Sequence, residues 1–542
     1  MPVPINTAKV PYYDIGILGA GFSGISAIYE ARKRGLSAHI FDGQSGFGGT
    51  WYQNRYPGAR VDSYIPIYEL SIPEVYNSWT WSEKYPDWRE IRKYFEHVDK
   101  VLDIKRDTTF DTFITSATFN KESGTWLLED KNGPLIQCRI FMPLVGFASK
   151  KYEPDFPGFD KFKGEVIHSN DWPEADDYSI LDNRKIGLIG TGSTGVQIVQ
   201  ESAPRADHLT VFQRTPNLCL PLRQEKTPKQ DKSNYPAIHA ERSKHPGGFL
   251  EKKYDINTFD VSPEEREKFW DSLFEKGGFL FWNNNYADLF FDEKANDEAY
   301  QYWRKRVHQR VKDPKVAEML APKVAPHPFG TKRPSLERTY FDDYNRDNVQ
   351  LVDVNKTPIK EFYEHGIVTE DGVKHEIDLL VLATGFDACD GSFKNFSVWN
   401  IEGTQTLSNE WRGPEGCSTW LGLAAKGYPN MFFTYGPQAP TALSNGPSCI
   451  SIQMDYLYKL LDKFFNGNYT YFEPDAAYQK AYRKRVDDYA ETTLFPRAKS
   501  SYMGANIPGK KVQMLNFSEG VAPYNELCKQ NIKADFEGWN FV

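Results

Sequence analysis

Two glycine-rich segments have the residue types and spacing that suit dinucleotide binding. Both match the pattern GxGxxG, first at residues 19–24 and again at residues 190–195. Glycines at these positions permit a tight turn and let the backbone approach a pyrophosphate, whose charge the N-terminus of the next helix attracts. A purely structural glycine turn is the alternative, so the flanking elements must decide.

The first glycine segment lies in a strand–turn–helix–strand pattern. Residues 14–18 predict a strand, residues 25–34 a helix, and residues 37–41 a second strand. That strand ends at Asp42, about 18 residues after Gly24, where a carboxylate can accept hydrogen bonds from a ribose. This order predicts a dinucleotide-binding unit of the ribose-binding type.

The second glycine segment follows the same order but ends differently. Residues 185–189 and 209–212 predict its two strands. Arg214 follows, about 19 residues after Gly195, where a guanidinium can bind a 2′-phosphate through two hydrogen bonds. A surface arginine is the alternative. Together, the two units predict FAD and NADPH as cofactors.

The order of predicted elements indicates an α/β fold with two Rossmann-like dinucleotide-binding domains. Residues 217–330 break the strand–helix alternation and include a capped helix start at Ser262, so we interpret them as a mostly helical insertion. Residues 349–353 and 376–384 predict strands that return to the second unit. The predicted parts are 1–145 and 388–542 for the FAD-binding domain, 146–216 and 331–387 for the NADP-binding domain, and 217–330 for the insertion.

The composition bounds the class of protein. The chain has 542 residues, 40% hydrophobic, enough for several packed domains, and its net charge of −8 argues against a nucleic-acid partner. No run approaches the ~18 apolar residues of a membrane span. Six scattered cysteines form no CxxC pair, which favours unbonded thiols in a reducing compartment. We therefore expect a soluble cytoplasmic monomer with no membrane or nucleic-acid partner.

Three further segments carry polar or aromatic residues whose chemistry is not evident from them alone. Residues 48–62 form a loop crowded with glycines and aromatic rings, and residues 331–334 form the basic turn Thr-Lys-Arg-Pro. A solvated surface loop is the alternative for both. The third segment, Phe162-x-Gly-x-x-x-His168-x-x-x-Trp172, lies between the two glycine units and is predicted to form neither a long helix nor a long strand.

Together these motifs resemble the Baeyer–Villiger monooxygenases, a family of class B flavoprotein monooxygenases. Residues 162–172 fit the family fingerprint FxGxxxHxxxW, and residues 48–62 fit a longer second fingerprint. The glycine units flank the first fingerprint as they do in that family. The resemblance extends from about residue 10 to about residue 515. Within the family, the chain most resembles the cyclohexanone and phenylacetone monooxygenase type.

The resemblance implies NADPH- and O2-dependent oxidation of ketones to esters or lactones through an FAD C4a-peroxide. Arg333 would be the catalytic arginine and Asp62 its carboxylate partner. A guanidinium keeps its charge at ordinary pH, so Arg333 can stabilise a peroxyanion and the oxyanion that develops on the substrate. Asp62 would orient Arg333, while His168 would couple domain movement to turnover without touching the ketone.

The resemblance also implies the cofactor contacts, position by position. The residues implied for FAD are Gly19, Gly21, Ser23, Gly24, Asp42, Thr50, Trp51, Gln53, Tyr68 and Gly446, with Gly49, Arg60 and Ile114 as further cofactor contacts. The residues implied for NADPH are Thr191, Gly192, Ser193, Thr194, Gly195, Gln197, Arg214, Thr215 and Lys332, the last beside Arg214 at the 2′-phosphate. No metal ligand is implied.

Three positions depart from the family pattern. Ser501, in a loop (499–510) that matches a mobile family loop, stands where the family often has tryptophan, so a large side chain is missing there. Gln53 also stands where tryptophan is frequent. We expect this change to affect the space available to the substrate or the coupling of NADPH oxidation to oxygenation. Asp42 replaces the usual glutamate, a change of one methylene.

Other functions fit parts of the sequence. An N- or S-oxygenating flavin monooxygenase shares both glycine units but usually lacks counterparts of Trp172 and Asp62. A flavin disulfide reductase needs a CxxC pair, which the chain does not contain. A nucleotide-sensing module would require neither Asp62 nor Arg333. The sequence does not identify the ketone, whose pocket we expect near residues 435–446, 500–510 and the helical insertion.

Overall fold

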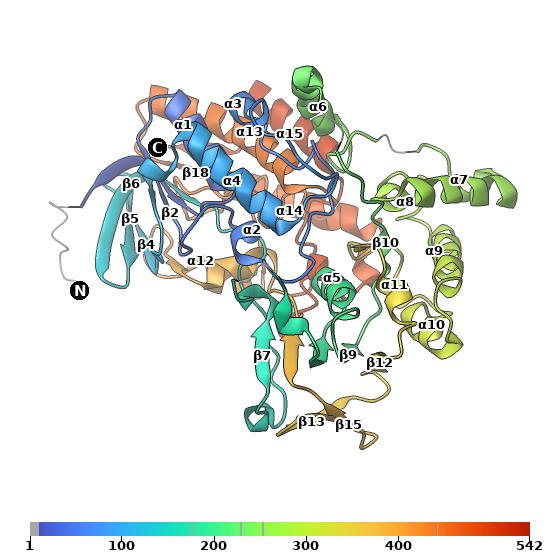
Figure 1. The fold of residues 1–542 in the computed structure, drawn as a ribbon. Coiled ribbons are helices and arrows are strands. Elements are labelled where there is room, and N and C mark those ends of the chain that lie inside the picture. Colours follow the sequence, from blue (N-terminus) through green and yellow to red (C-terminus); the bar gives the residue numbers. More distant parts are fainter. Residues whose placement is uncertain (1–9, 175–176, 228–229, 252–253, 442) are drawn as a thin grey trace.

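Two sheets organise the chain in the computed structural model, which describes residues 10–174, 177–227, 230–251, 254–441 and 443–542. Each sheet contains the strand that leads into one of the glycine turns. Figure 1 shows the second sheet below the first, with the helices of residues 217–330 to one side. The predicted α/β fold with two Rossmann-like domains is confirmed.

The first sheet has seven strands in the order β17-β4-β5-β6-β1-β2-β3. Its strands are β1 Tyr12–Leu18, β2 Ala38–Phe41, β3 Thr108–Thr109, β4 Ser116–Asn120, β5 Thr125–Asp130, β6 Gly133–Pro143 and β17 Ser397–Val398. Strands β6, β1, β2 and β3 are parallel, whereas β4, β5 and β6 pair antiparallel. Helix α1 (Phe22–Lys33) follows the glycine turn and packs against α13 (Gly446–Asn466), so the C-terminal part of the chain returns to this sheet.

The second sheet has five parallel strands in the order β12-β9-β8-β16-β7. Its strands are β7 Glu165–His168, β8 Lys185–Ile189, β9 His208–Gln213, β12 Val349–Asp353 and β16 Leu379–Leu382. Residues 162–172 therefore contain an edge strand, β7, that the sequence did not indicate. Four residues, of which only the last two are buried, are too short a run to show a strand pattern.

The helices of residues 217–330 are α6 Tyr235–Glu241, α7 Pro263–Lys276, α8 Leu280–Asn283, α9 Glu293–His308 and α10 Pro314–Leu320. The predicted capped start of α7 is present, because Ser262 Oγ accepts a hydrogen bond from the Glu265 amide at 3.2 Å and the Glu265 carboxylate accepts one from the Ser262 amide at 3.0 Å. The sequence did not indicate α4 (Trp88–Leu102) or the small antiparallel sheet of β13 (Ile359–Tyr363), β14 (Gly366–Thr369) and β15 (Lys374–Glu376).

The described residues contain neither a helix suited to a membrane span nor a side-chain cluster suited to a metal site. None of their helices combines the length and apolarity that crossing a membrane requires. They also contain no group of three or more histidine, cysteine, aspartate or glutamate side chains arranged to hold a metal ion.

Candidate active site

A cavity of about 830 Å³ brings together residues from distant parts of the chain. They include residues of the first glycine turn, the loop 48–62, the segment after β6, residues 435–450, and Ser501 with Tyr502. The predicted site residues that line it are Gly19, Gly21, Ser23, Asp42, Gly49, Thr50, Trp51, Gln53, Arg60, Asp62, Tyr68, Ile114, Ser193, Arg333 and Gly446.

The first glycine turn leaves no room for side chains on its inner side. Gly19 has a φ of 112°, and a Cβ there would lie 2.5 Å from the carbonyl oxygen of Leu144. A Cβ on Gly24 would lie 1.9 Å from the carbonyl oxygen of Gly19. Gly24 therefore does not line the cavity; it lets α1 start close behind the turn, so that the helix N-terminus lies at the cavity.

Asp42 is buried at the end of β2, where its carboxylate holds the turn. One oxygen accepts a hydrogen bond from the Ala20 amide at 2.6 Å and the other from the Gln44 amide at 2.8 Å. Burial raises the pKa of Asp42, while these two amides oppose the rise. Each carboxylate oxygen has a second lone pair, so Asp42 can still accept from a ribose hydroxyl on its cavity side.

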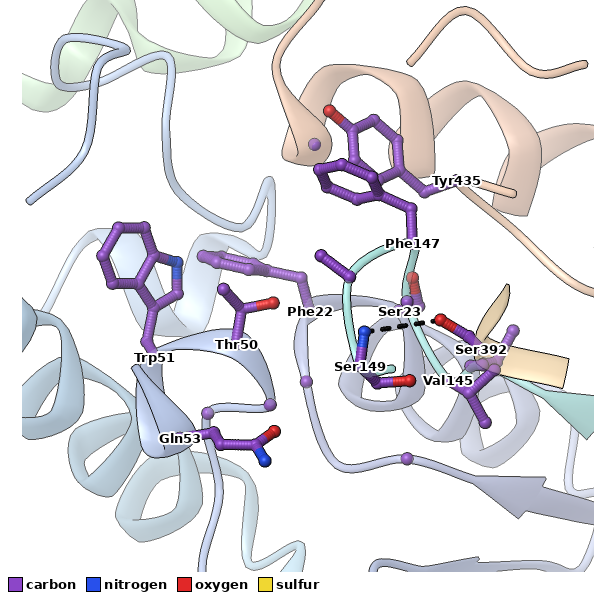
Figure 2. Close-up of a pocket in the computed structure, with 18 of the residues that line it drawn as sticks. Phe22, Ser23, Thr50, Trp51, Gln53, Val145, Phe147, Ser149, Ser392 and Tyr435 are labelled. Atoms are coloured by element: carbon purple, nitrogen blue, oxygen red, sulfur yellow. Dashed lines mark hydrogen bonds between the residues drawn. The ribbon is translucent and has the colours of Figure 1, made fainter. Parts of the chain in front are cut away.

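Part of the cavity lies between two groups of side chains. Figure 2 shows Trp51, Thr50 and Gln53 on one side and Phe147 with Tyr435 on the other. Trp51 Nε1 donates to the Tyr68 hydroxyl at 3.0 Å, which fixes the indole. The Phe147 and Tyr435 rings meet edge-on, with centroids 5.4 Å apart. This space suits a flat ring system with apolar faces.

Arg333 and Asp62 form a bidentate ion pair in the cavity wall. Arg333 Nε donates to one carboxylate oxygen of Asp62 at 2.7 Å, and Nη2 donates to the other at 2.8 Å. Nη1 donates to the carbonyl oxygen of Ser444 at 3.1 Å. Burial works against the charge of Arg333, but Asp62 outweighs it and raises the pKa of the guanidinium above its ordinary value.

The helical insertion supports Arg333 from behind. The guanidinium carbon lies 4.6 Å from the ring centroid of Phe279 and 5.5 Å from that of Trp282 in α8. Trp282 Nε1 donates to the Gly330 carbonyl at 3.0 Å, and the neighbouring Thr331 is fully buried. The basic turn 331–334 is therefore packed against the rest of the site and is not a solvated surface turn.

The second glycine turn repeats the geometry of the first. A Cβ on Gly195 would lie 2.1 Å from the Gly190 carbonyl oxygen, whereas one on Gly192 would meet nothing within 4 Å. Helix α5 (Ser193–Ser202) starts at this open position. Thr191 Oγ1 donates to the Thr215 carbonyl at 2.7 Å and so ties the turn to the end of β9.

Most residues predicted for NADPH lie outside the large cavity. Of these residues, only Ser193 lines it; Thr191, Gly192, Thr194, Gly195, Gln197, Arg214, Thr215 and Lys332 do not. Gln197 instead joins the two domains, because its side chain donates to the Arg60 carbonyl at 3.2 Å and accepts from the Tyr56 hydroxyl at 2.8 Å.

Arg214 lies close enough to Lys332 for its charge to act on the Lys332 ammonium, although the two residues are far apart in sequence. Burial, with a further contribution from the positive charge of Arg214, lowers the pKa of Lys332 to about 8. Two cations held near each other favour a bound anion, because the anion relieves their repulsion. This electrostatic influence agrees with the predicted pairing, and a phosphate between the two side chains would raise the pKa of Lys332 again.

Phe147, Tyr435 and Tyr502 line the site but were not named from the sequence, although Tyr435 and Tyr502 lie in the segments 435–446 and 500–510 where the ketone pocket was expected. Both tyrosines lie close enough to Arg333 for its charge to act on their hydroxyls, yet burial raises the pKa of each phenol above its ordinary value. They therefore stay neutral. Phe147 follows β6 at the carboxyl end of a parallel strand, which is where ligands bind in such sheets and is the signal that could have found it.

The chain is similar over almost its whole length to flavin-dependent monooxygenases. The model of the flavin-binding monooxygenase-like family matches residues 13–227. Cyclopentanone 1,2-monooxygenase of Comamonas sp. (strain NCIMB 9872) is 40% identical over 99% of this chain and 98% of its own length. Phenazine N-monooxygenase of Lysobacter antibioticus is 35% identical over 97% of each chain. The crystal structure of OTEMO in complex with FAD and NADP matches with a TM-score of 0.93 at 32% identity, covering 98% of this chain and 100% of that one.

Proposed function

The chain belongs to the Baeyer–Villiger monooxygenases of the flavin-binding monooxygenase-like family, and we propose that it oxidises ketones to esters or lactones with NADPH and O2. One oxygen atom enters beside the ketone carbonyl and the other leaves as water, while NADPH and a proton supply the two electrons and hydrogens. The observation that carries this assignment is the Arg333–Asp62 pair in the wall of the cavity.

The chain fits both cofactors. Gly19, Gly24 and Asp42 form a cradle without side-chain bulk for the adenosine half of FAD, and Trp51 and Phe147 bound the space for its flat ring. The second glycine turn, with Arg214 and Lys332, fits NADPH. When bound, FAD supplies the activation of O2 with electrons from NADPH.

Arg333 has the task of stabilising negative charge where the ketone reacts. Its guanidinium is held by Asp62 and by the Ser444 carbonyl, so it needs no rearrangement when charge develops on the substrate oxygen. Because its pKa is raised, it does not act as a proton donor at neutral pH. Asp62 sets its orientation and balances its charge.

N-oxygenation is the second candidate function, because the relative from Lysobacter antibioticus is named for it. Attack on an amine or thioether develops no oxyanion on the substrate, so it gives Arg333 and Asp62 no comparable role. A panel separates the two functions: NADPH consumption is measured with cyclic, linear and aryl ketones, an amine and a thioether, and the products are identified. Ester or lactone from at least one ketone supports the proposal; N-oxide with no ester from any ketone contradicts it.

We also propose that the protein works as a cytoplasmic monomer. All six cysteines are free and buried, which suits a reducing compartment. Size-exclusion chromatography with light scattering tests the oligomeric part, since a monomer has a mass of 62.3 kDa.

A further inference from the structure

A buried cluster of two lysines and two aspartates joins the loop 499–510 to the segment that follows β16. Lys510 Nζ lies 2.9 Å from Asp387 Oδ1 and also contacts a carboxylate oxygen of Asp390, while Lys394 pairs with the other oxygen of Asp387. The Lys510, Asp387 and Asp390 side chains are only 8%, 9% and 4% exposed. The two charges of each sign balance within the cluster.

The aspartates belong to the crossing between the two domains, by which we mean the paired segments 147–152 and 385–390. The Asp387 amide donates to the Lys150 carbonyl at 2.9 Å, and the Tyr152 amide donates to the Gly385 carbonyl at 2.9 Å. Cys389 has a φ of 66°, unusual for a residue with a side chain, and its amide donates to the Phe147 carbonyl at 2.8 Å. Lys510 therefore contacts two aspartates of the crossing, in the segment that pairs with Phe147 of the cavity wall.

The loop that Lys510 closes carries two residues of the cavity wall. Ser501 and Tyr502 line the cavity, and the Tyr502 hydroxyl lies within the electrostatic reach of Arg333. A second tie runs from the same loop to the same crossing, since Asn506 Nδ2 donates to the Phe386 carbonyl at 3.0 Å. The neighbouring Lys511 is different: it is exposed and donates to the carbonyls of Pro414 and Glu415 at 2.6 and 2.9 Å.

We propose that Lys510 is a positioning residue, whose ammonium between Asp387 and Asp390 fixes the loop 499–510 over the cavity and so keeps water from the reacting atoms. Without the ammonium, the buried Asp390 carboxylate loses its ion-pair partner, Asp387 keeps only Lys394, and the loop loses an ionic tie to the crossing. Water entry then diverts turnover from oxygen transfer to release of hydrogen peroxide. This role rests on the proposed ketone oxidation, but the placement of the loop can be tested without it.

The test uses the FAD-loaded enzyme with Lys510→Met, Asp390→Asn, the double variant, and Lys511→Met as the matched control. Amide hydrogen exchange of residues 499–510 should be at least about fivefold faster in Lys510→Met and unchanged in Lys511→Met. Because Lys510 acts partly through Asp390, the double variant should be no faster than Lys510→Met. Equal exchange in the wild type and Lys510→Met overturns the proposal, as does an equal increase in Lys511→Met.

The second readout is the fate of NADPH. With a ketone that the wild type converts, Lys510→Met should form at least about threefold less ester per NADPH, with hydrogen peroxide making up the difference. NADPH oxidation itself should stay within about twofold, whereas a merely structural defect lowers it together with FAD content. Lys510→Arg should restore most of the coupling, and unchanged coupling in Lys510→Met contradicts the role. Absence of ester in the wild type instead contradicts the proposed function, and hydrogen exchange still decides the loop.

Discussion

Asp62 holds Arg333 through two parallel hydrogen bonds of 2.7 and 2.8 Å, although 271 residues separate them in the sequence. Asp62 comes from the loop after α2 (Thr50–Gln53) of the first domain, and Arg333 from the turn that follows the helical insertion. The pair therefore spans the domains, and both members face the cavity that fits FAD. The geometry of this ion pair depends on how the two domains pack, so the pair forms only when the domains are correctly placed relative to each other.

Asp62→Asn should lower ester formation by about 10²-fold, because an amide keeps the shape of the carboxylate but cannot balance the guanidinium charge. Asp62→Ala should lower it further, since it also removes the orientation of Arg333. The measurement is kcat for ester at saturating NADPH, with FAD content as the control for folding. Ester formation by Asp62→Asn within about twofold of the wild type would show that charge balance is unimportant.

Two alanine substitutions separate the cofactor roles of the glycine turns. In Gly24→Ala the new Cβ lies 1.9 Å from the Gly19 carbonyl oxygen, so α1 must shift and retention of FAD should fall strongly. In Gly195→Ala the Cβ lies 2.1 Å from the Gly190 carbonyl oxygen, so FAD should stay bound while KM for NADPH rises by at least about tenfold. FAD absorbance and steady-state kinetics measure both. Loss of FAD in Gly195→Ala but not in Gly24→Ala would reverse the assignment.

Removing both Arg214 and Lys332 should raise KM for NADPH much more than KM for NADH, because only NADPH carries the 2′-phosphate. Equal effects on both cofactors would contradict the pairing. Since the pKa of Lys332 is lowered to about 8, its ammonium is present below that pH and is lost above it. KM for NADPH should therefore rise as pH climbs through 8. Lys332→Arg, which keeps its charge, should remove this rise, and KM for NADH should not show it.

Ser501→Trp should reduce release of hydrogen peroxide in the absence of ketone. Ser501 lines the cavity, and an indole there covers more of it than a hydroxymethyl group, which excludes water. The measurement is hydrogen peroxide per NADPH oxidised, with Ser501→Ala as the control for loss of the hydroxyl. An increase in hydrogen peroxide would show that the indole does not close the site.

The sequence predicted what local patterns determine. Both glycine turns, their flanking strands and the cap at Ser262 are visible in short windows, because each needs particular residue types at fixed spacing. The contact between Asp62 and Arg333 has no local signal, so only the family resemblance indicated it. Phe147 was missed because an aromatic residue at a strand end more often packs in a core, whereas Tyr435 was indicated only through the segment 435–446 and not as a single residue. The ion cluster at Lys510 was missed because its members become neighbours only when both crossing segments meet.

Arg333→Ala tests the central claim most directly. The measurement is ester formed per NADPH consumed, at saturating ketone, in FAD-loaded enzyme of the wild type, Arg333→Ala and Arg333→Lys. Arg333→Ala should lower ester formation by about 10²- to 10³-fold while FAD stays bound, and Arg333→Lys should recover little, because a single ammonium nitrogen cannot reproduce the two parallel bonds that the guanidinium makes to Asp62. Coupling to ester near the wild-type value in Arg333→Ala would contradict the assigned role of this residue.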